Sequence, residues 1–332
     1  MRENGLSLVI CARQSGEVMF LSAGPDEGEC FSSMLPLPGA MGACLNDGIM
    51  IVGGSDGVIV LRDISNADPN TSVFILAKRH STGNVGIRDV SWSGGEGRIR
   101  FVNTMFSSIC ELDDVSGFRT VWRPPTVEQV DPSDSVHING MATVPGGRVV
   151  VTMLGLGGRA ANWRESGPDG GVLYDASGGH AILSNLSLPH SPVWSGGKIW
   201  FLESGRGILC HLKENGHKQV QGEFDGVARG LSIAETMAAI GLSPVRKADD
   251  SIRHLMKGRF PSRTSCEVAL VDIASGARLG GIYLPMLPEI SSLHWHRRAA
   301  TFFATPAAEH GAAYFTYRED QSSTASDRLH RS

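Results

Sequence analysis

Six short β-prone runs begin at nearly regular intervals along the chain, and this spacing is the feature that most constrains the fold. The gaps between successive starts are 47, 50, 51, 39 and 60 residues, an average of about 49. A repeat of this length is typical of the four-stranded blades of a β-propeller, whereas a β-sandwich, our second choice, needs no regular spacing. Six such units nearly exhaust the 332 residues. The sequence therefore predicts an all-β, six-bladed propeller with blade starts at Gly42, Asp89, Asn139, His190, Arg229 and Glu289.

The segments between these starts have the pattern of antiparallel hairpins. Helical periodicity is nearly absent, and apolar runs such as residues 58–61, 148–152 and 198–202 alternate with glycine turns. The chain has 41 glycines, which reach the positive φ angles of tight hairpin turns without steric cost. This pattern favours several short strands within each unit.

The two ends of the chain carry strand patterns that no complete repeat uses. Residues 6–13 and 17–23 precede the first unit, and residues 292–296, 300–305 and 313–317 follow the last. We expect these segments to complete one shared blade, because a closed ring leaves no exposed sheet edge. They contain enough strand for two blades, so a seven-bladed propeller is the alternative.

The pattern predicts a single domain over residues 1–320, with two segments that depart from it. Residues 234–263 interrupt the strand pattern and could form a lid over the channel mouth or an ordinary long loop. Within them, residues 249–257 could form a short helix. Residues 321–332 are polar and rich in Ser and Arg, so we expect a disordered tail.

Composition and charge limit the classes of partner. Charged residues make up 19% and hydrophobic residues 41%, which indicates a globular chain. A net charge of −4 without a basic block does not support nucleic-acid binding. We see no signal peptide and no apolar run near the roughly 20 residues that span a bilayer, so we expect a soluble, cytoplasmic protein without a membrane partner. Buried free thiols are expected for all the cysteines, which are Cys11, Cys30, Cys44, Cys110, Cys210 and Cys266.

Polar residues stand at or beside the predicted blade starts. Innermost strands line the channel of a propeller, so side chains near their starts converge from different blades on one axis. We therefore expect His137, His190 and Arg229 to share one pocket; the alternative is that they only satisfy backbone atoms or channel waters. The candidate set is His137, Asn139, Arg229, Trp163 and Arg164 as catalytic residues, and His137, His190, Glu289 and Asp89 as metal ligands.

Two kinds of chemistry fit these side chains. Two imidazoles with the carboxylates of Asp89 and Glu289 could hold one divalent metal, Zn²⁺, Fe²⁺ or Mn²⁺, with open coordination positions. The same groups could act as general acid and base without a metal. In either case Arg229 could bind a substrate carboxylate through two parallel hydrogen bonds.

Two further features lie away from the blade starts. Trp163 and Arg164 belong to a long glycine-rich loop and could contact a ligand at the rim, or Trp163 could fill the space between blades. His294 and His296 fall on one face of a strand by alternation. They could form a metal pair, although no third ligand stands near them in the sequence.

Several short motifs follow one another between about residue 85 and residue 275. They include residues 137–140 (His-Ile-Asn-Gly), 163–165 (Trp-Arg-Glu), 189–192 (Pro-His-Ser-Pro) and 229–231 (Arg-Gly-Leu). With these motifs the chain resembles a bacterial family of conserved hypothetical β-propeller proteins, catalogued as a domain of unknown function. The resemblance implies a propeller and no particular activity.

This chain departs from the family pattern at two blade starts. It has Arg88 and Asp89 where the family tends to show His-Asp, and Ser291 and Ser292 after Glu289 and Ile290 where Phe-Asp is expected. Both changes weaken the case that a metal site shared by the family is intact here.

The sequence leaves two functions open. An enzyme would act on a small molecule or peptide at the channel mouth, and the fold does not choose among lyase, hydrolase, isomerase and oxygenase chemistry. A non-catalytic scaffold would instead hold a protein or peptide on the channel face. The polar blade starts favour the enzyme.

Overall fold

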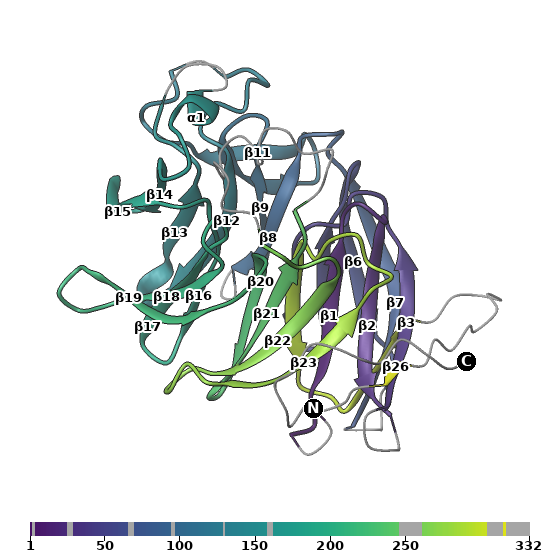
Figure 1. Cartoon of the computed structure of the whole chain (residues 1–332). Coiled ribbons are helices and arrows are strands. Elements are labelled where there is room, and N and C mark those ends of the chain that lie inside the picture. Colours follow the sequence, from purple (N-terminus) through teal and green to yellow (C-terminus); the bar gives the residue numbers. More distant parts are fainter. Residues whose placement is uncertain are drawn as a thin grey trace.

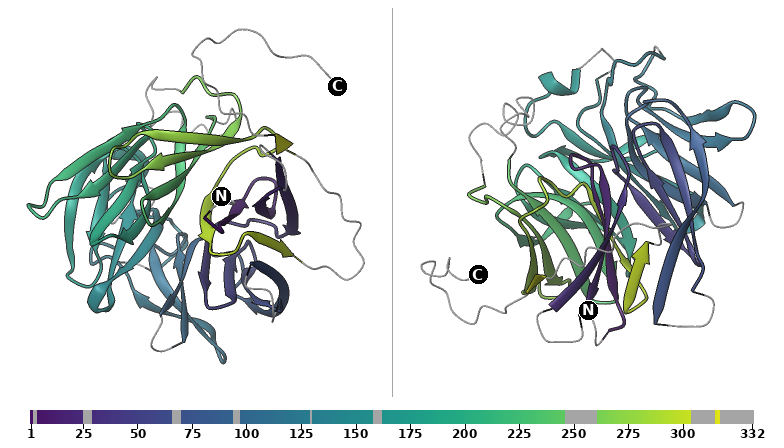
Figure 2. Two further views of the ribbon diagram at one scale, coloured as in Figure 1. Left: turned by 90° about the horizontal axis from the view of Figure 1, so that it is seen from below. Right: turned by 90° about the vertical axis from the view of Figure 1, so that its right-hand side faces the viewer.

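The computed structural model describes residues 1, 4–24, 29–65, 70–93, 97–128, 130–157, 162–245, 261–303 and 315–316. In this part of the chain six antiparallel sheets stand around a common axis, as Figure 1 and Figure 2 show. The prediction of an all-β, six-bladed propeller is confirmed. The two alternatives, seven blades and a β-sandwich, are wrong.

The first three blades follow one another along the chain, and each begins with its innermost strand. Tight turns join the strands; Asp47 and Gly48, with φ angles of 41° and 75°, connect the first hairpin. Blade 1 comprises β4 (Ala43–Asn46), β5 (Ile49–Gly53), β6 (Gly57–Asp63) and β7 (Thr71–Ser81). Blade 2 comprises β8 (Ile87–Ser93), β9 (Arg98–Asn103), β10 (Ser108–Asp113) and β11 (Gly117–Trp122). Blade 3 comprises β12 (Ile138–Val144), β13 (Arg148–Met153), β14 (Gly171–Asp175) and β15 (His180–Leu186), with η1 (Pro145–Gly147) and α1 (Asn162–Glu165) in its loops.

The other three blades complete the ring. Blade 4 comprises β16 (Pro189–Ser195), β17 (Lys198–Glu203), β18 (Ile208–Leu212) and β19 (Lys218–Glu223). Blade 5 comprises β20 (Val227–Ala234), β21 (Met237–Ser243), β22 (Cys266–Asp272) and β23 (Arg278–Leu284). Blade 6 comprises β24 (Ser292–His296), β1 (Ser7–Ala12), β2 (Glu17–Ala23) and β3 (Glu29–Pro36). Every predicted blade start therefore lies within an innermost strand or no more than three residues before one.

Blade 6 closes the ring, because it combines both ends of the chain. The C-terminal strand β24 is innermost and pairs antiparallel with the N-terminal strand β1, so that His294 lies opposite Val9. The yellow β24 segment beside the purple N-terminal strands is visible in Figure 2. At the outer edge, β26 (Phe315–Thr316) pairs with β3. The predicted shared blade is thus confirmed for these segments.

One C-terminal strand is placed differently from the prediction. β25 (Ala300–Phe303) does not join blade 6 but pairs in parallel with β7 of blade 1. The hydroxyl groups of Thr301 and Ser7 lie 2.6 Å apart, and the backbone N–H of Thr301 donates to Ser22 Oγ at 2.8 Å. β25 therefore ties blade 6 to blade 1.

The interruption predicted over residues 234–263 begins later than expected. β20 and β21 form an ordinary hairpin of blade 5, so residues 237–243 are a strand and not part of a lid. The expected helix over residues 249–257 lies outside the described residues, and so does the tail of residues 321–332.

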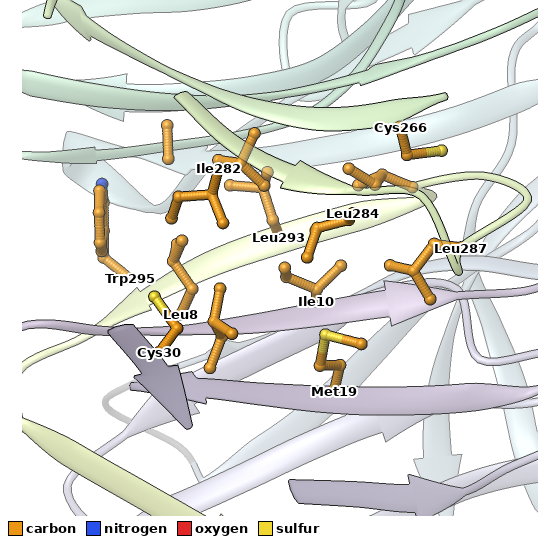
Figure 3. Packing of buried hydrophobic residues seen from close by; sticks show 14 of the residues in the cluster. Leu8, Ile10, Met19, Cys30, Cys266, Ile282, Leu284, Leu287, Leu293 and Trp295 are labelled. Carbon is orange, nitrogen blue, oxygen red and sulfur yellow. The ribbon is translucent and has the colours of Figure 1, made fainter. Parts of the chain in front are cut away.

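The hydrophobic core lies between neighbouring blades. In Figure 3, Leu8, Ile10 and Met19 of blade 6 pack against Ile282 and Leu284 of blade 5. Each fully buried side chain of this kind contributes about 1.5–3 kcal/mol to folding. All six cysteines are free, and all but the half-buried Cys44 are buried.

The innermost strands are irregular at the predicted blade starts. The register with the second strand shifts between Ile87 and Val90, Ile138 and Gly140, His190 and Val193, and Arg229 and Leu231. Such bulges change the direction in which a side chain points and increase the local twist. They determine how the polar residues of four blades face the axis.

Candidate functional site

A cavity of about 400 Å³ lies on the axis, and residues from all six innermost strands line it. Because the blades repeat by rotation, these strands run in one direction and their starts lie at the same end. The candidates in the lining are Asp89, Asn139, His190 and Arg229, and Arg88 lines the cavity as well. His137 and Glu289 lie next to this lining and not in it. The predicted pocket thus brings His190 and Arg229 together, with His137 close enough to lower the pKa of His190.

Contacts of His190 fix its tautomer. Nδ1 lies 2.9 Å from the carbonyl oxygen of Leu188 and 2.9 Å from Ser204 Oγ, which donates to the carbonyl of Ala228 at 2.5 Å. A carbonyl only accepts, so Nδ1 carries the proton and Nε2 presents a lone pair. The hydrogen bonds of the ring to described residues are all made by Nδ1, and the ring lines the cavity.

Burial also keeps His190 neutral. The pKa of its imidazole is lowered well below 6.5 by burial and then by the nearby charge of Arg229. A neutral ring with a free Nε2 can accept a proton from a bound molecule. The strained backbone supports the ring, because Leu188 and Ser191 on either side have φ angles of 49° and 53°.

His137 forms a pair with a carboxylate that the sequence analysis missed. Its Nδ1 lies 2.7 Å from Oδ2 of Asp134, and both residues adopt left-handed φ angles of 51° and 52°. Burial lowers the pKa of His137 below its ordinary value, and Asp134 opposes this shift only in part. The carboxylate orients the ring and favours its protonated form, as it does in histidine–carboxylate pairs generally.

Trp163 and Arg164 stand over His137 on α1, at one end of the ring in Figure 1. The Trp163 ring centroid lies 4.5 Å from that of His137, and the Arg164 guanidinium carbon lies 4.0 Å from the same indole centroid. Trp163 is buried with Leu154, Leu188 and Val227 of three blades. This packing matches the inter-blade alternative, while the contact with His137 places Trp163 beside the candidate site.

The remaining predicted residues are held by other protein groups. Nη1 of Arg229 lies 3.5 Å from Oε2 of Glu289, and both side chains are buried. Asn139 Oδ1 accepts the hydroxyl proton of Thr152 at 2.6 Å. Asp89 accepts the backbone N–H groups of Val90 and, from blade 3, Met141, both at 2.9 Å. Burial raises the pKa of Asp89 to about 7.

The metal centre predicted for His137, His190, Glu289 and Asp89 is not formed. Nowhere in the described ranges do three or more His, Cys, Asp or Glu side chains gather as a metal site. The physical reason is that Asp89 binds backbone N–H groups and Glu289 binds Arg229, so neither carboxylate is directed at an imidazole. His294 and His296 also have different surroundings. His294 lines the cavity, whereas His296 Nε2 lies 2.8 Å from Ser72 Oγ.

Arg88 is the second residue that sequence reasoning overlooked. It was noted only as a departure from the His-Asp pattern, yet it lies within the bulge of β8 and lines the cavity. A charged residue inside an innermost strand was the signal available in the sequence. No comparable signal marked Asp134, which lies in an irregular loop.

Comparisons with known proteins agree with this architecture. Residues 1–294 match the model of a family described as a domain of unknown function (DUF4915). No curated protein matches the chain. A chain in the crystal structure of a nidogen/laminin complex is 12% identical, with a TM-score of 0.59 over 88% of this chain and 99% of that one.

Two other solved structures are named after enzymes. A putative gluconolactonase is 11% identical with a TM-score of 0.51, covering 86% of this chain and 89% of its own. Virginiamycin B lyase from Staphylococcus aureus is 9% identical with a TM-score of 0.46, covering 87% and 98%. At identities this low, the nidogen/laminin chain and the putative gluconolactonase show a common fold and nothing more. No helix in the described ranges is long and apolar enough to cross a membrane.

Proposed function

This chain belongs to the DUF4915 family, a domain of unknown function, and we propose that it is an enzyme acting on a small molecule in the axial cavity. Family membership agrees with the resemblance seen in the sequence, while the individual motifs stay predictions. The observation that carries the proposal is His190, a neutral imidazole that lines the cavity with its Nε2 unprotonated. The cavity volume of about 400 Å³ is of the size that holds small ligands.

The two histidines have environments that suit opposite roles. Arg229 disfavours a proton on His190, whereas Asp134 favours one on His137. Burial lowers the pKa of both rings, but only His137 has a carboxylate beside it that opposes this shift. We assign His190 as the general base and His137 as the general acid, with Trp163 packed on His137 as a positioning residue.

The test is a search for substrate that depends on His190. Purified protein is incubated with a soluble small-molecule extract, and mass spectrometry follows compounds that disappear or form. We expect a conversion that His190→Gln slows by about 10²–10⁴-fold, the usual contribution of a general base. His217→Gln, at an exposed turn position, is the matched control and should keep the wild-type rate.

Two results would count against the enzyme. One is an extract in which no compound changes; the other is a conversion that continues at the same rate in His190→Gln. A compound that is retained by the protein but never converted would favour the alternative, a non-catalytic binding propeller.

A further inference from the structure

Arg88 is a charged side chain in the channel whose hydrogen-bonding capacity is unused. It lines the cavity, and its guanidinium forms neither a hydrogen bond nor an ion pair with any residue that the structure describes. Burial, together with the charges of Arg13 and Arg229, lowers the pKa of Arg88 to about 10, so it remains charged at neutral pH. A partly buried guanidinium that has no protein partner can bind an anion that enters the cavity.

Asn139 supplies a second unused donor in the lining of the same cavity. Its side chain is only 7% exposed, and its oxygen already accepts the Thr152 hydroxyl. The amide nitrogen Nδ2 is buried and finds no acceptor within the described part of the chain. An amide donor without a partner and a guanidinium in the same lining both suit an acceptor, and the guanidinium favours one with negative charge.

Charges of both signs act on Arg88 at this end of the channel. Arg13, Arg88 and Arg229 lie close enough to influence one another, and the carboxylates that act on Arg88 are Asp134 and Glu289. Arg88 is therefore influenced by two other cations as well as by two carboxylates. Asp89 adds only part of a negative charge at neutral pH, because burial raises its pKa to about 7.

We propose that Arg88 and Asn139 bind the oxyanion group, a carboxylate or a phosphate, of the small molecule that occupies the cavity. This inference rests on the proposed function, since it names the class of substrate that the same cavity takes. A guanidinium fork holds such a group through two parallel hydrogen bonds, and the amide adds a third donor. Arg229, which the sequence suggested for this role, is instead paired with Glu289.

The test measures the melting temperature, Tm, while acetate or inorganic phosphate is added at constant ionic strength. A ligand that binds only the folded state raises Tm with its concentration, so the shift reports affinity. We expect the wild-type Tm to rise with at least one of the two anions. Arg88→Met should bind that anion at least about tenfold more weakly. Without either anion this variant should melt at the wild-type temperature or above it, because an unpaired buried charge has been removed.

Two further variants serve as controls. Arg148→Met removes a half-exposed guanidinium paired with Asp175 in blade 3, and it should keep the wild-type response. Arg88→Lys keeps the charge but loses the fork, so it should respond more weakly than wild type. If Arg88→Met does not fold, the comparison of Arg88→Lys with the wild type still tests the inference.

The outcomes separate this inference from the proposed enzyme. A response to acetate alone assigns a carboxylate, a response to phosphate alone assigns a phosphate, and either supports the site. The inference is overturned if the wild-type Tm does not respond to either anion. It is also overturned if Arg88→Met and Arg88→Lys respond as strongly as the wild type. His190→Gln should bind the anion as the wild type does, so a lost reaction with intact anion binding counts only against the enzyme.

Discussion

Polar residues around the channel differ in whether the protein already satisfies their hydrogen-bonding groups. Asp89 accepts a backbone N–H from the next blade, and Ser191 Oγ accepts the backbone N–H of Gly230, so both side chains join neighbouring blades. Arg88 and Nε2 of His190 have no such partner in the described residues. The first pair stabilises the ring, and the second is available to a ligand.

The sequence predicted the residue types of the site better than their roles. Blade spacing placed His190 and Arg229 near one axis, because a repeat fixes where each innermost strand starts. The spacing could not show that Asp89 would accept backbone N–H groups, because that depends on the distance between adjacent blades. For this reason the predicted metal ligands do not gather as one group in the described ranges, although every proposed ligand type is present.

Asp134 allows a test at the residue scale. Asp134→Asn should lower the pKa of His137 further, because the carboxylate that raises it is lost while burial remains. Asparagine tolerates the left-handed backbone that Asp134 adopts, so the fold should be kept. Titration of the ring by NMR measures the change, and an unchanged pKa would mean that Asp134 does not act on His137.

The bulged innermost strand is the element that builds the site. Four of these strands shift register at the candidate residues, so adjacent side chains turn toward the axis. Three of the bulges carry a residue that is unusual inside a strand: Gly230, with a φ angle of 75°, Gly140 and Pro192. The bulge of β8 contains only Arg88 and Asp89, so the sequence did not mark it in this way.

Gly230 offers a test of the bulge. A Cβ added there would lie 2.8 Å from the backbone nitrogen of Leu293 on β24, in addition to the cost of a positive φ. Gly230→Ala should therefore destabilise the fold by about 3 kcal/mol or more. The matched control is Gly216→Ala, with a φ angle of 79° and open space around it, which should cost about 1 kcal/mol. Chemical denaturation measures both, and equal losses would contradict the close contact of β20 with β24.

At the scale of the whole molecule, the ring is closed by strands from both chain ends. The unused strand patterns at the termini predicted this shared blade, because any propeller without it would expose two sheet edges. The position of β25 was not predictable, since a four-residue strand carries too little pattern to choose between two neighbouring blades.

Truncation tests the closure. A chain ending at Ser291 lacks β24 with the buried Leu293 and Trp295, so we expect loss of cooperative unfolding. A chain ending at Phe303 keeps β24 and β25 and should melt within a few degrees of the full chain. Circular dichroism during heating measures both, and a cooperative, wild-type transition in the shorter chain would show that β24 is dispensable.

The proposed function depends most on the charge and the tautomer of the His190 ring. ¹⁵N NMR of labelled histidine rings measures both, and the signal that is lost in His190→Gln identifies His190. At about pH 6, near the ordinary pKa of histidine, we predict a neutral His190 ring that carries its proton on Nδ1. A charged ring at that pH, or a proton on Nε2, would contradict the account, because His190 would then have no lone pair to offer the cavity.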